Sequence, residues 1–298
     1  MYAIETTDLT KYYGKSRGII RVNLAVEEGD FFGFIGPNGA GKSTAVRALL
    51  GLIRPSSGSA KIFNMDCIRE QNQILSEIGY LPSETVFYSG MRVKDVIRLS
   101  CDLRKKDCRK AAEELCERLQ LDLMKKIDEL SFGNRKKVGI VCALSHSPRL
   151  CILDEPTSGL DPLMQREFFA ILRERSRQGT TVFLSSHVLS EIQHNCNHAA
   201  IIREGRIIAS GSVEDLAKAS AKRVVVHGST EPIFLDGIRD QQAIEDGLRF
   251  LYNGDINALL QVLSRRKLRD LSISEPDLEE IFLHYYMEGD TKNDTYPA

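Results

Sequence analysis

The chain has 298 residues, of which 42% are apolar and 27% charged, so it is long enough for roughly two domains of about 150 residues. Its 40 lysines and arginines nearly balance its 41 aspartates and glutamates, which excludes a general electrostatic attraction to nucleic acid or to an anionic membrane. No apolar run approaches the ~18 residues of a membrane-spanning helix, and the first residues lack the pattern of a secretory signal, so we expect a cytoplasmic protein.

The predicted elements begin with antiparallel strands within about the first 30 residues, where short apolar runs alternate with turn residues. The apolar run at 31–36 predicts a buried strand, and helix-spaced apolar residues over 42–53 predict a helix that Pro55 ends. From about residue 93 to 145 the pattern is helical and strongly charged. We therefore expect a helical subdomain over about residues 85–147.

Strands and helices alternate again from residue 149. Strands are expected at 149–156 and 180–186, helices at 163–177 and 188–196, and a strand pair is joined at 204–205. This alternation predicts an α/β fold with a mostly parallel sheet. Beyond Ser220 a separate pattern predicts a small α+β accessory domain. The predicted domains are residues 1–219 and 220–289, followed by a flexible polar tail at 290–298.

The seven cysteines are odd in number and form no Cys-x-x-Cys pair, which argues against a disulfide framework or a zinc ribbon. We expect most of them to be buried or half-buried thiols. His194 and His198 have a spacing that can share a metal on a helix, but no third ligand is nearby, so a metal site is not expected there.

Residues 36–44 read GPNGAGKST and fit the pattern G-x-x-x-x-G-K-[ST] between a strand and a helix. Glycines allow the backbone to approach closely, so the amides at the helix start can surround phosphate oxygens. The lysine brings positive charge to the β and γ phosphates, and the first hydroxyl can ligate magnesium. The predicted phosphate loop consists of Gly36, Pro37, Asn38, Gly39, Ala40, Gly41, Lys42, Ser43 and Thr44.

An acidic pair ends the predicted strand at 149–156. Asp154 and Glu155 follow the apolar residues 151–153, so both are expected at the carboxyl edge of the sheet, where ligands of α/β proteins gather. We expect Asp154 to hold Mg²⁺, directly or through water, and Glu155 to act as general base on the attacking water.

Together these motifs resemble the ATP-binding cassette (ABC) ATPases. The resemblance covers residues 1 to about 219 and rests on an ordered set: Tyr13, GPNGAGKST, LSFGN at 130–134, LCILDEP at 150–156, SGLD at 158–161, and His187. It implies a P-loop NTPase fold with a mixed sheet, an antiparallel β subdomain and a helical subdomain. It also implies ATP and Mg²⁺ as ligands.

The resemblance assigns further roles. Tyr13 would stack on adenine, with Tyr12 as a competitor, and His187 would bind the γ-phosphate. Ser131 and Gly133 would contact the γ-phosphate held by an opposite subunit, and Asp161 would couple the two nucleotide sites. The chain would therefore work as a dimer, with a second copy of itself or with a homologous ATPase subunit.

Two positions depart from the family pattern. The signature LSGGQ is here LSFGN, with Phe132 and Asn134 as the changes. The loop that usually carries a glutamine in contact with water and magnesium has Ser83 at that place, with Glu84 next to it. Both changes could slow hydrolysis.

The basic run 135–137 lies just inside a predicted helix without aromatic neighbours, so we expect a solvated helix face and no nucleic-acid site.

The leading functional hypothesis is an ATP-hydrolysing subunit that energises a separate membrane permease and is peripheral on the inner face of the membrane. The C-terminal run PDLEEIFLHYY and the LSFGN variant resemble the bacterial subfamily that powers ABC-2 type permeases, mostly exporters. The helical subdomain and the loop at 83–88 would dock on the permease. One alternative is a soluble ABC ATPase of translation or DNA maintenance, and another is an ATP-dependent switch with slow turnover.

Overall fold

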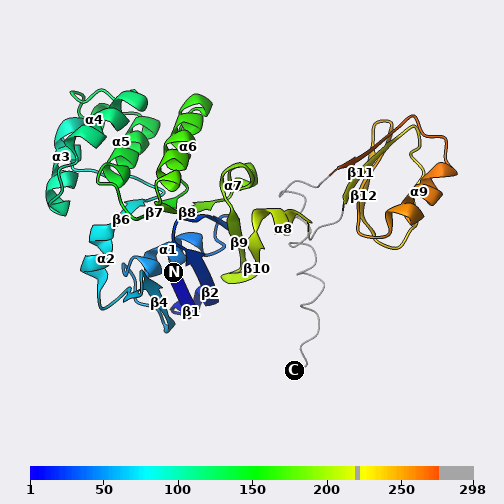
Figure 1. Ribbon diagram of the computed structural model, residues 1–298, viewed down its shortest axis with the longest axis horizontal. Coiled ribbons are helices and arrows are strands. Elements are labelled where there is room, and N and C mark those ends of the chain that lie inside the picture. The colour runs from blue at the N-terminus through cyan, green and yellow to red at the C-terminus, as the bar shows by residue number, and fades with distance from the viewer. Residues whose placement is uncertain (219–221, 275–298) are drawn as a thin grey trace. The chain divides into compact units, whose positions relative to one another are not determined.

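The computed structural model describes residues 1–218 and 222–274, and the chain divides into two compact units, Met1–Ser210 and Gly211–Ala298 (Figure 1). This division falls earlier than the predicted boundary after residue 219. Residues 219–221, the run PDLEEIFLHYY at 276–286 and the predicted tail at 290–298 lie outside the described residues.

The first unit begins with an antiparallel sheet in the order β2-β1-β4-β5. Strands β1 (Tyr2–Tyr13) and β2 (Ser16–Glu27) form the predicted hairpin. Strands β4 (Ser57–Ile62) and β5 (Met65–Asp66) and helix α2 (Gln71–Glu77) were not predicted, because their exposed residues give no clear apolar period.

A six-stranded sheet forms the centre of the first unit, in the order β10-β9-β3-β8-β7-β6. Pairs β9/β3, β3/β8, β8/β7 and β7/β6 are parallel, which confirms the predicted topology. Its strands are β3 (Phe31–Ile35), β6 (Ile78–Leu81), β7 (Leu150–Asp154), β8 (Thr181–Ser186), β9 (His198–Arg203) and β10 (Arg206–Ser212). Strand β6, which the sequence analysis did not predict, ends just before Pro82, so Ser83 lies in the loop that follows it.

Helix α1 (Lys42–Leu49) contacts both sheets, through β2 and β4 on one side and β7 on the other. One apolar cluster joins them, and it includes Val46 and Leu49 of α1, Phe34 of β3 and Ile62 of β4. Helices α6 (Pro162–Arg177) and α7 (Leu189–Asn195) also pack on the central strands. Burial on both faces explains why the central strands are continuous apolar runs rather than alternating ones.

The predicted helical subdomain consists of α3 (Val93–Arg104), α4 (Arg109–Arg118), a short 3-10 helix (Ile127–Glu129) and α5 (Phe132–Leu144). Figure 1 shows α3, α4 and α5 gathered together, with α5 next to α6. Helix α5 contacts α3, α4 and strand β6, so it connects this subdomain to the central sheet.

The second unit has a short helix, α8 (Val213–Lys218), and an antiparallel sheet in the order β12-β13-β11-β14, with helix α9 (Ile256–Ser264). The strands are β11 (Lys222–His227), β12 (Ile238–Ile244), β13 (Gly247–Tyr252) and β14 (Asp270–Ser274). Phe250, Val224, Leu259 and Leu263 belong to its apolar core, so α9 packs on this sheet as an amphipathic helix.

Candidate active site

The phosphate loop, residues 36–44, connects the fully buried strand β3 to helix α1. Gly39 and Gly41 have φ values of 81° and 110°, and a Cβ on Gly41 would lie 2.7 Å from the carbonyl oxygen of Gly18. Both positions therefore need glycine. Among the described residues no side chain caps α1, so the amides of its first turn are available to an external acceptor. The loop thus fits a phosphate group.

Lys42 is the first residue of α1, and only 6% of it is exposed. Its Nζ donates to the carbonyl oxygens of Gly36 at 2.6 Å and Pro37 at 3.2 Å. The same Nζ lies 3.1 Å from Oε1 of Glu155. The ammonium is therefore folded over the phosphate loop and faces the carboxylate that follows strand β7.

The carboxyl ends of β3, β8 and β7 meet at one edge of the central sheet and carry the other candidate residues. Asp154 ends β7, is buried, and accepts a hydrogen bond from Oγ of Ser185. Glu155 follows with a φ of 48°, and its amide donates to the Ser185 carbonyl at 3.1 Å. His187 follows β8, and its Nδ1 donates to Oε2 of Glu155 at 2.6 Å. The fold thus brings Lys42, Glu155 and His187 together.

Glu191 belongs to the same region, although the sequence analysis gave it no role. Its Oε2 accepts a hydrogen bond from Oγ of Ser186 at 2.8 Å, and that Oγ accepts one from the amide of Val188 at 2.9 Å. Burial raises the pKa of Glu191, and the nearby Glu155 carboxylate adds to this. These bonds fix the residues on both sides of His187. A single acidic residue on a short helix gives no sequence signal for such a role.

Ser43 and Asp154 supply the hard oxygen donors that Mg²⁺ prefers, from the first turn of α1 and the end of β7. Magnesium is commonly held by one or two protein oxygens together with substrate phosphates and water, so this donor set fits the ion. Ser83, the third predicted ligand, follows β6, and its carbonyl accepts a hydrogen bond from Lys136. Within residues 1–218 and 222–274, no hydrogen bond joins Ser83 to Asp154.

Ser131, Gly133 and Asp161 form a second cluster. Ser131 caps α5 by accepting a hydrogen bond from the amide of Asn134 at 3.3 Å, and Asp161 caps α6 with its carboxylate. A Cβ on Gly133 would overlap the carbonyl oxygen of Gly159, so the starts of the two helices are in close contact. In the part of the chain that the structure describes, no hydrogen bond or ion pair connects this cluster to Lys42, Glu155 or His187.

Phe132, which replaces a glycine of the signature, packs against the same turn. A Cβ on Gly159 would overlap the Phe132 ring, so that glycine makes room for the aromatic side chain. The ring remains partly exposed beside Ser131. The substitution therefore leaves the Ser131 cap intact and adds a contact to the 158–161 turn.

The sequence predicted that the basic run 135–137 forms a solvated helix face, and the structure shows that this prediction is wrong. Only Arg135 is exposed, whereas Lys136 is fully buried and Lys137 nearly so. The Nζ of Lys136 donates to the carbonyl oxygens of Pro82 at 2.9 Å and Ser83 at 2.8 Å. Burial lowers the pKa of Lys136 to about 8, although nearby carboxylates partly oppose this. Sequence patterns missed the burial because the tertiary contact comes from a distant loop.

Tyr13 ends β1 and lies beside the phosphate loop. A Cβ on Gly18 would lie 3.0 Å from Cε2 of Tyr13 and 2.9 Å from Cγ2 of Thr44. The Tyr13 ring is 45% exposed, and Nζ of Lys11 lies 5.5 Å from its centre. The amide of Tyr12 donates to the Ser56 hydroxyl at 3.0 Å, on the side of β4. The Tyr13 ring lies next to the phosphate loop, and its stacking on adenine stays a prediction.

All seven cysteines are free, and all except Cys142 are buried, as expected. His194 and His198 do not converge on a metal: His194 donates to the Ser190 carbonyl, and His198 to the carboxylate of Asp30. Among the described residues there is no group of three or more metal-binding side chains of the His, Cys, Asp or Glu type. None of the described helices has the length and apolar character required to cross a membrane.

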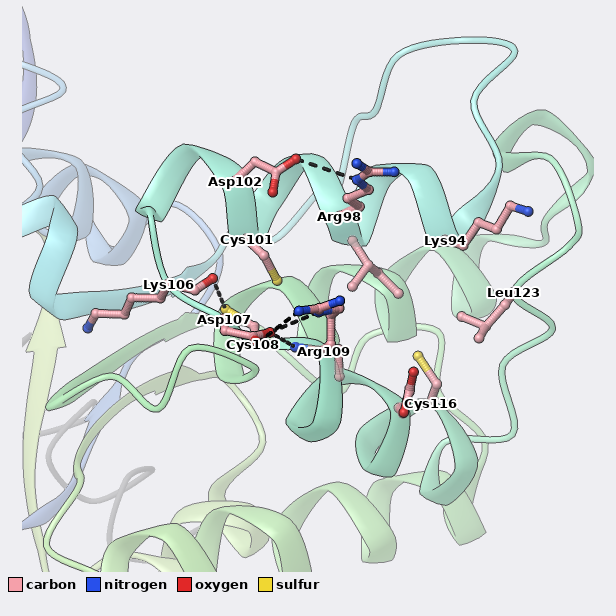
Figure 2. Close-up of a pocket in the computed structure, with 13 residues that line it drawn as sticks. Lys94, Arg98, Cys101, Asp102, Lys106, Asp107, Cys108, Arg109, Cys116 and Leu123 are labelled. Atoms are coloured by element: carbon pink, nitrogen blue, oxygen red, sulfur yellow. Dashed lines mark hydrogen bonds and ion pairs between the residues drawn. The ribbon is translucent and has the colours of Figure 1, made fainter.

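A cavity of about 540 Å³ lies between α3 and α4, away from the phosphate loop (Figure 2). Cys101, Cys108 and Cys116 line it, and ion pairs such as Arg98 with Asp102 lie at its rim. Burial raises the pKa of Cys108 and of Cys116 to about 11. The Cys108 and Cys116 thiols therefore stay protonated at neutral pH, which argues against a nucleophilic role for either of them.

Comparison of the sequence with known proteins identifies a family that this chain matches. The sequence model described as ABC transporter matches residues 19–158. The bacitracin transport ATP-binding protein BcrA of Bacillus licheniformis is 34% identical over 297 residues, which cover 94% of this chain and 96% of that protein. The probable multidrug ABC transporter ATP-binding protein YbhF of Escherichia coli K12 is 33% identical over 80% of this chain, which spans 42% of that longer protein.

Solved structures agree on the fold. An ATP-binding subunit of an ABC transporter is 28% identical and superposes with a TM-score of 0.68, covering 73% of this chain and 92% of that chain. A dimeric ATP-binding cassette in a post-hydrolysis state, bound to ADP and Pi, has a TM-score of 0.63 at 22% identity, covering 70% of this chain and 98% of that chain.

Proposed function

Because this chain belongs to the family of ABC transporter ATP-binding proteins, and so is an ATPase subunit that uses ATP with Mg²⁺, we propose that it powers a separate ABC-2 type permease that exports its cargo. The observation that carries the ATP-hydrolysing part of the proposal is the convergence of Lys42, Glu155 and His187 beside the phosphate loop. The exporter assignment is supported by the names of two relatives, a bacitracin transport ATP-binding protein and a probable multidrug ABC transporter ATP-binding protein.

The proposed chemistry is in-line attack of water on the γ-phosphorus of ATP, in which the bond to the β,γ-bridging oxygen breaks and ADP leaves. The α1 amides and Lys42 bind the β and γ phosphates, and Glu155 accepts a proton from the attacking water. His187 donates to the γ-phosphate from its position against Glu155. Ser43 and Asp154, with Ser83 at the edge strand, would hold Mg²⁺, which neutralises charge that develops on the phosphate oxygens. The ATP phosphates would compete with Glu155 for the Lys42 ammonium.

The second cluster, formed by Ser131, Gly133 and Asp161, supports a contact with the nucleotide that another subunit binds. Ser131 and Gly133 lie at the amino end of α5, where the helix dipole and the first amides favour an anion. Among the residues that the structure describes, no hydrogen bond or ion pair joins them to the chain's own Lys42 site. We therefore assign them to the nucleotide bound by a partner ATPase subunit, either a second copy or a homologue, with Asp161 linking the two sites.

The permease would dock on a groove of about 380 Å³ between the loop at 86–91 and helix α3, here called the docking groove. Exposed apolar side chains gather there: Val86 is 87% exposed, and Tyr88, Leu99 and Leu103 are also exposed. An apolar groove on the surface of a protein favours a partner with an apolar segment. This docking would keep the chain peripheral on the inner face of the membrane.

The test is copurification with a polytopic membrane protein from the native host, using the tagged full-length chain. We expect wild type and Arg98→Ser to retain the membrane partner, and Val86→Asp/Leu103→Asp to lose it while its own ATP hydrolysis stays measurable. Arg98 is the control because it is an exposed residue of α3 outside the docking groove. Association of the chain with ribosomes, and with no membrane protein, would instead support the soluble alternative.

A further inference from the structure

The loop that lines the docking groove is anchored to helix α5 by a buried lysine. Residues 82–85, here called the anchored segment, lead from β6 to Val86. Two of its carbonyl oxygens, those of Pro82 and Ser83, accept hydrogen bonds from Nζ of Lys136. Lys136 is fully buried, so its ammonium has exchanged water for these two acceptors. A charged donor makes such bonds stronger than neutral ones.

A second contact lies one turn further along α5. A Cβ on Gly139 would lie 2.6 Å from Cγ2 of Thr85 and 2.8 Å from Cδ1 of Leu81. The missing side chain of Gly139 therefore lets the anchored segment lie directly on the helix. The lysine binds the start of the segment and the glycine accommodates its end, so the two residues together fix its position.

We propose that Lys136 and Gly139 are positioning residues that lock the anchored segment onto α5, so that the docking groove and the Ser131 end of that helix move as one body. α5 begins at the Ser131 cap, and the anchored segment continues into Val86 and Tyr88 of the groove. A displacement of the groove is thus passed to Ser131 through a packed helix rather than through flexible chain. The role of the groove rests on the proposed function, whereas the lock itself is a property of this chain alone.

The lock is tested by hydrogen exchange and ATP kinetics on the purified full-length chain. In Lys136→Met, which keeps the apolar stem and removes the donor, amides at 82–88 should exchange at least about tenfold faster. Its kcat should fall about tenfold while KM for ATP stays within about twofold, because phosphate binding is untouched and only the geometry is loosened. Arg135→Met, the loss of an exposed cation on the same helix, is the matched control and should change neither.

A second pair of variants keeps the test independent of the folding of Lys136→Met. Gly139→Ala should also raise exchange at 82–88 and lower kcat, because the new methyl group meets Thr85. Adding Thr85→Ser removes the Cγ2 atom, the closer of the two contacts, and leaves Cδ1 of Leu81 at 2.8 Å, so it should restore both values in part. Unchanged exchange at 82–88 in folded Lys136→Met, or no rescue of Gly139→Ala by Thr85→Ser, would overturn the lock. Both readouts are made without a permease, so they stand even where copurification fails.

Discussion

Glu155 lies at the centre of the site in a backbone conformation that is rare for a residue with a side chain. Its φ of 48° costs on the order of 1–3 kcal/mol for a non-glycine residue. The hydrogen bond of its amide to Ser185, the ion pair with Lys42 and the hydrogen bond from His187 oppose this cost. The carboxylate meets Lys42 of the phosphate loop, where the proposed general base would accept a proton from the attacking water.

Replacement of this carboxylate gives the sharpest test of the chemistry. Glu155→Gln should lower steady-state phosphate release at least about 100-fold, because an amide cannot accept the proton of the attacking water. ATP binding, measured at equilibrium, should persist, since the phosphate loop is unchanged. Glu113→Gln, an exposed residue of α4, is the control. Equal inactivity of wild type and Glu155→Gln would favour the slow-turnover switch.

The roles of Tyr13 and Tyr12 can be distinguished by the ATP affinity of variants at each position. Tyr13→Ala should weaken ATP binding about tenfold, because the stacking of a base on an aromatic ring contributes roughly 1–3 kcal/mol. Tyr12→Ala should change the affinity less than about twofold, since its backbone is bonded to Ser56 on the side of β4. Titration with a fluorescent ATP analogue measures both, and the reverse ranking would transfer the role to Tyr12.

At the scale of elements, helix α5 connects the signature turn, the anchored segment and the central sheet. Its start is capped by Ser131, Lys136 and Gly139 contact the loop after β6, and the helix ends just before His146. The buried ring of His146 donates through Nε2 to the carbonyl of Ile78 at 3.1 Å, which ties the end of the helix to β6. One helix thus holds both ends of β6 and its loop.

Because of His146, we expect the free energy of unfolding to fall in mild acid. Burial, together with Arg104, lowers its pKa from 6.5 to about 4, so between these values the unfolded chain binds a proton that the folded chain does not. Stability therefore falls as pH drops below 6.5, by about 2 kcal/mol at pH 5 from this residue.

Urea unfolding of wild type and His146→Gln at pH 7 and pH 5 measures this contribution. The glutamine amide can donate to Ile78 but does not titrate, so the variant should lose less stability between the two pH values. Equal losses in the two proteins would exclude His146 as the cause.

At the scale of the whole molecule, one chain carries two candidate clusters, and within residues 1–218 and 222–274 no hydrogen bond or ion pair joins them. Lys42, Glu155 and His187 gather at the sheet edge, while Ser131, Gly133 and Asp161 gather at the starts of α5 and α6. A symmetric dimer can pair the first cluster of one chain with the second cluster of the other, and this forms two composite sites. Two chains with different defects should therefore complement each other.

Lys42→Ala and Ser131→Arg provide that test. Each variant alone should hydrolyse little ATP, because both composite sites of its homodimer are damaged. An equimolar mixture should recover up to about a quarter of wild-type turnover, since half of the dimers are mixed and each has one intact site. Turnover equal to the sum of the separate variants would show that each chain uses its own signature segment.

Much of the fold could be predicted from the sequence, because local patterns carry it. The apolar runs at 31–36 and 149–156 became buried parallel strands, and the helical subdomain lies where the charged helical period begins. The unpredicted β4, β5, α2 and β12 are short or largely exposed, so their apolar periods are weak. Their strands form by pairing with neighbours, which a local pattern does not record.

The sequence by itself determined the chemistry of the site: the glycines and Lys42 of the phosphate loop, the Asp154–Glu155 pair and the helix starts at Ser131 and Asp161 are all read from short-range order. Only the tertiary structure decided that Lys136 is buried against a loop more than 50 residues away, and that Glu191 supports the backbone around His187. The physical reason is that burial and hydrogen-bond partners depend on packing between distant segments. The charge of Lys136 predicted an ammonium in contact with water, whereas in the folded chain this ammonium donates hydrogen bonds to two carbonyl oxygens instead.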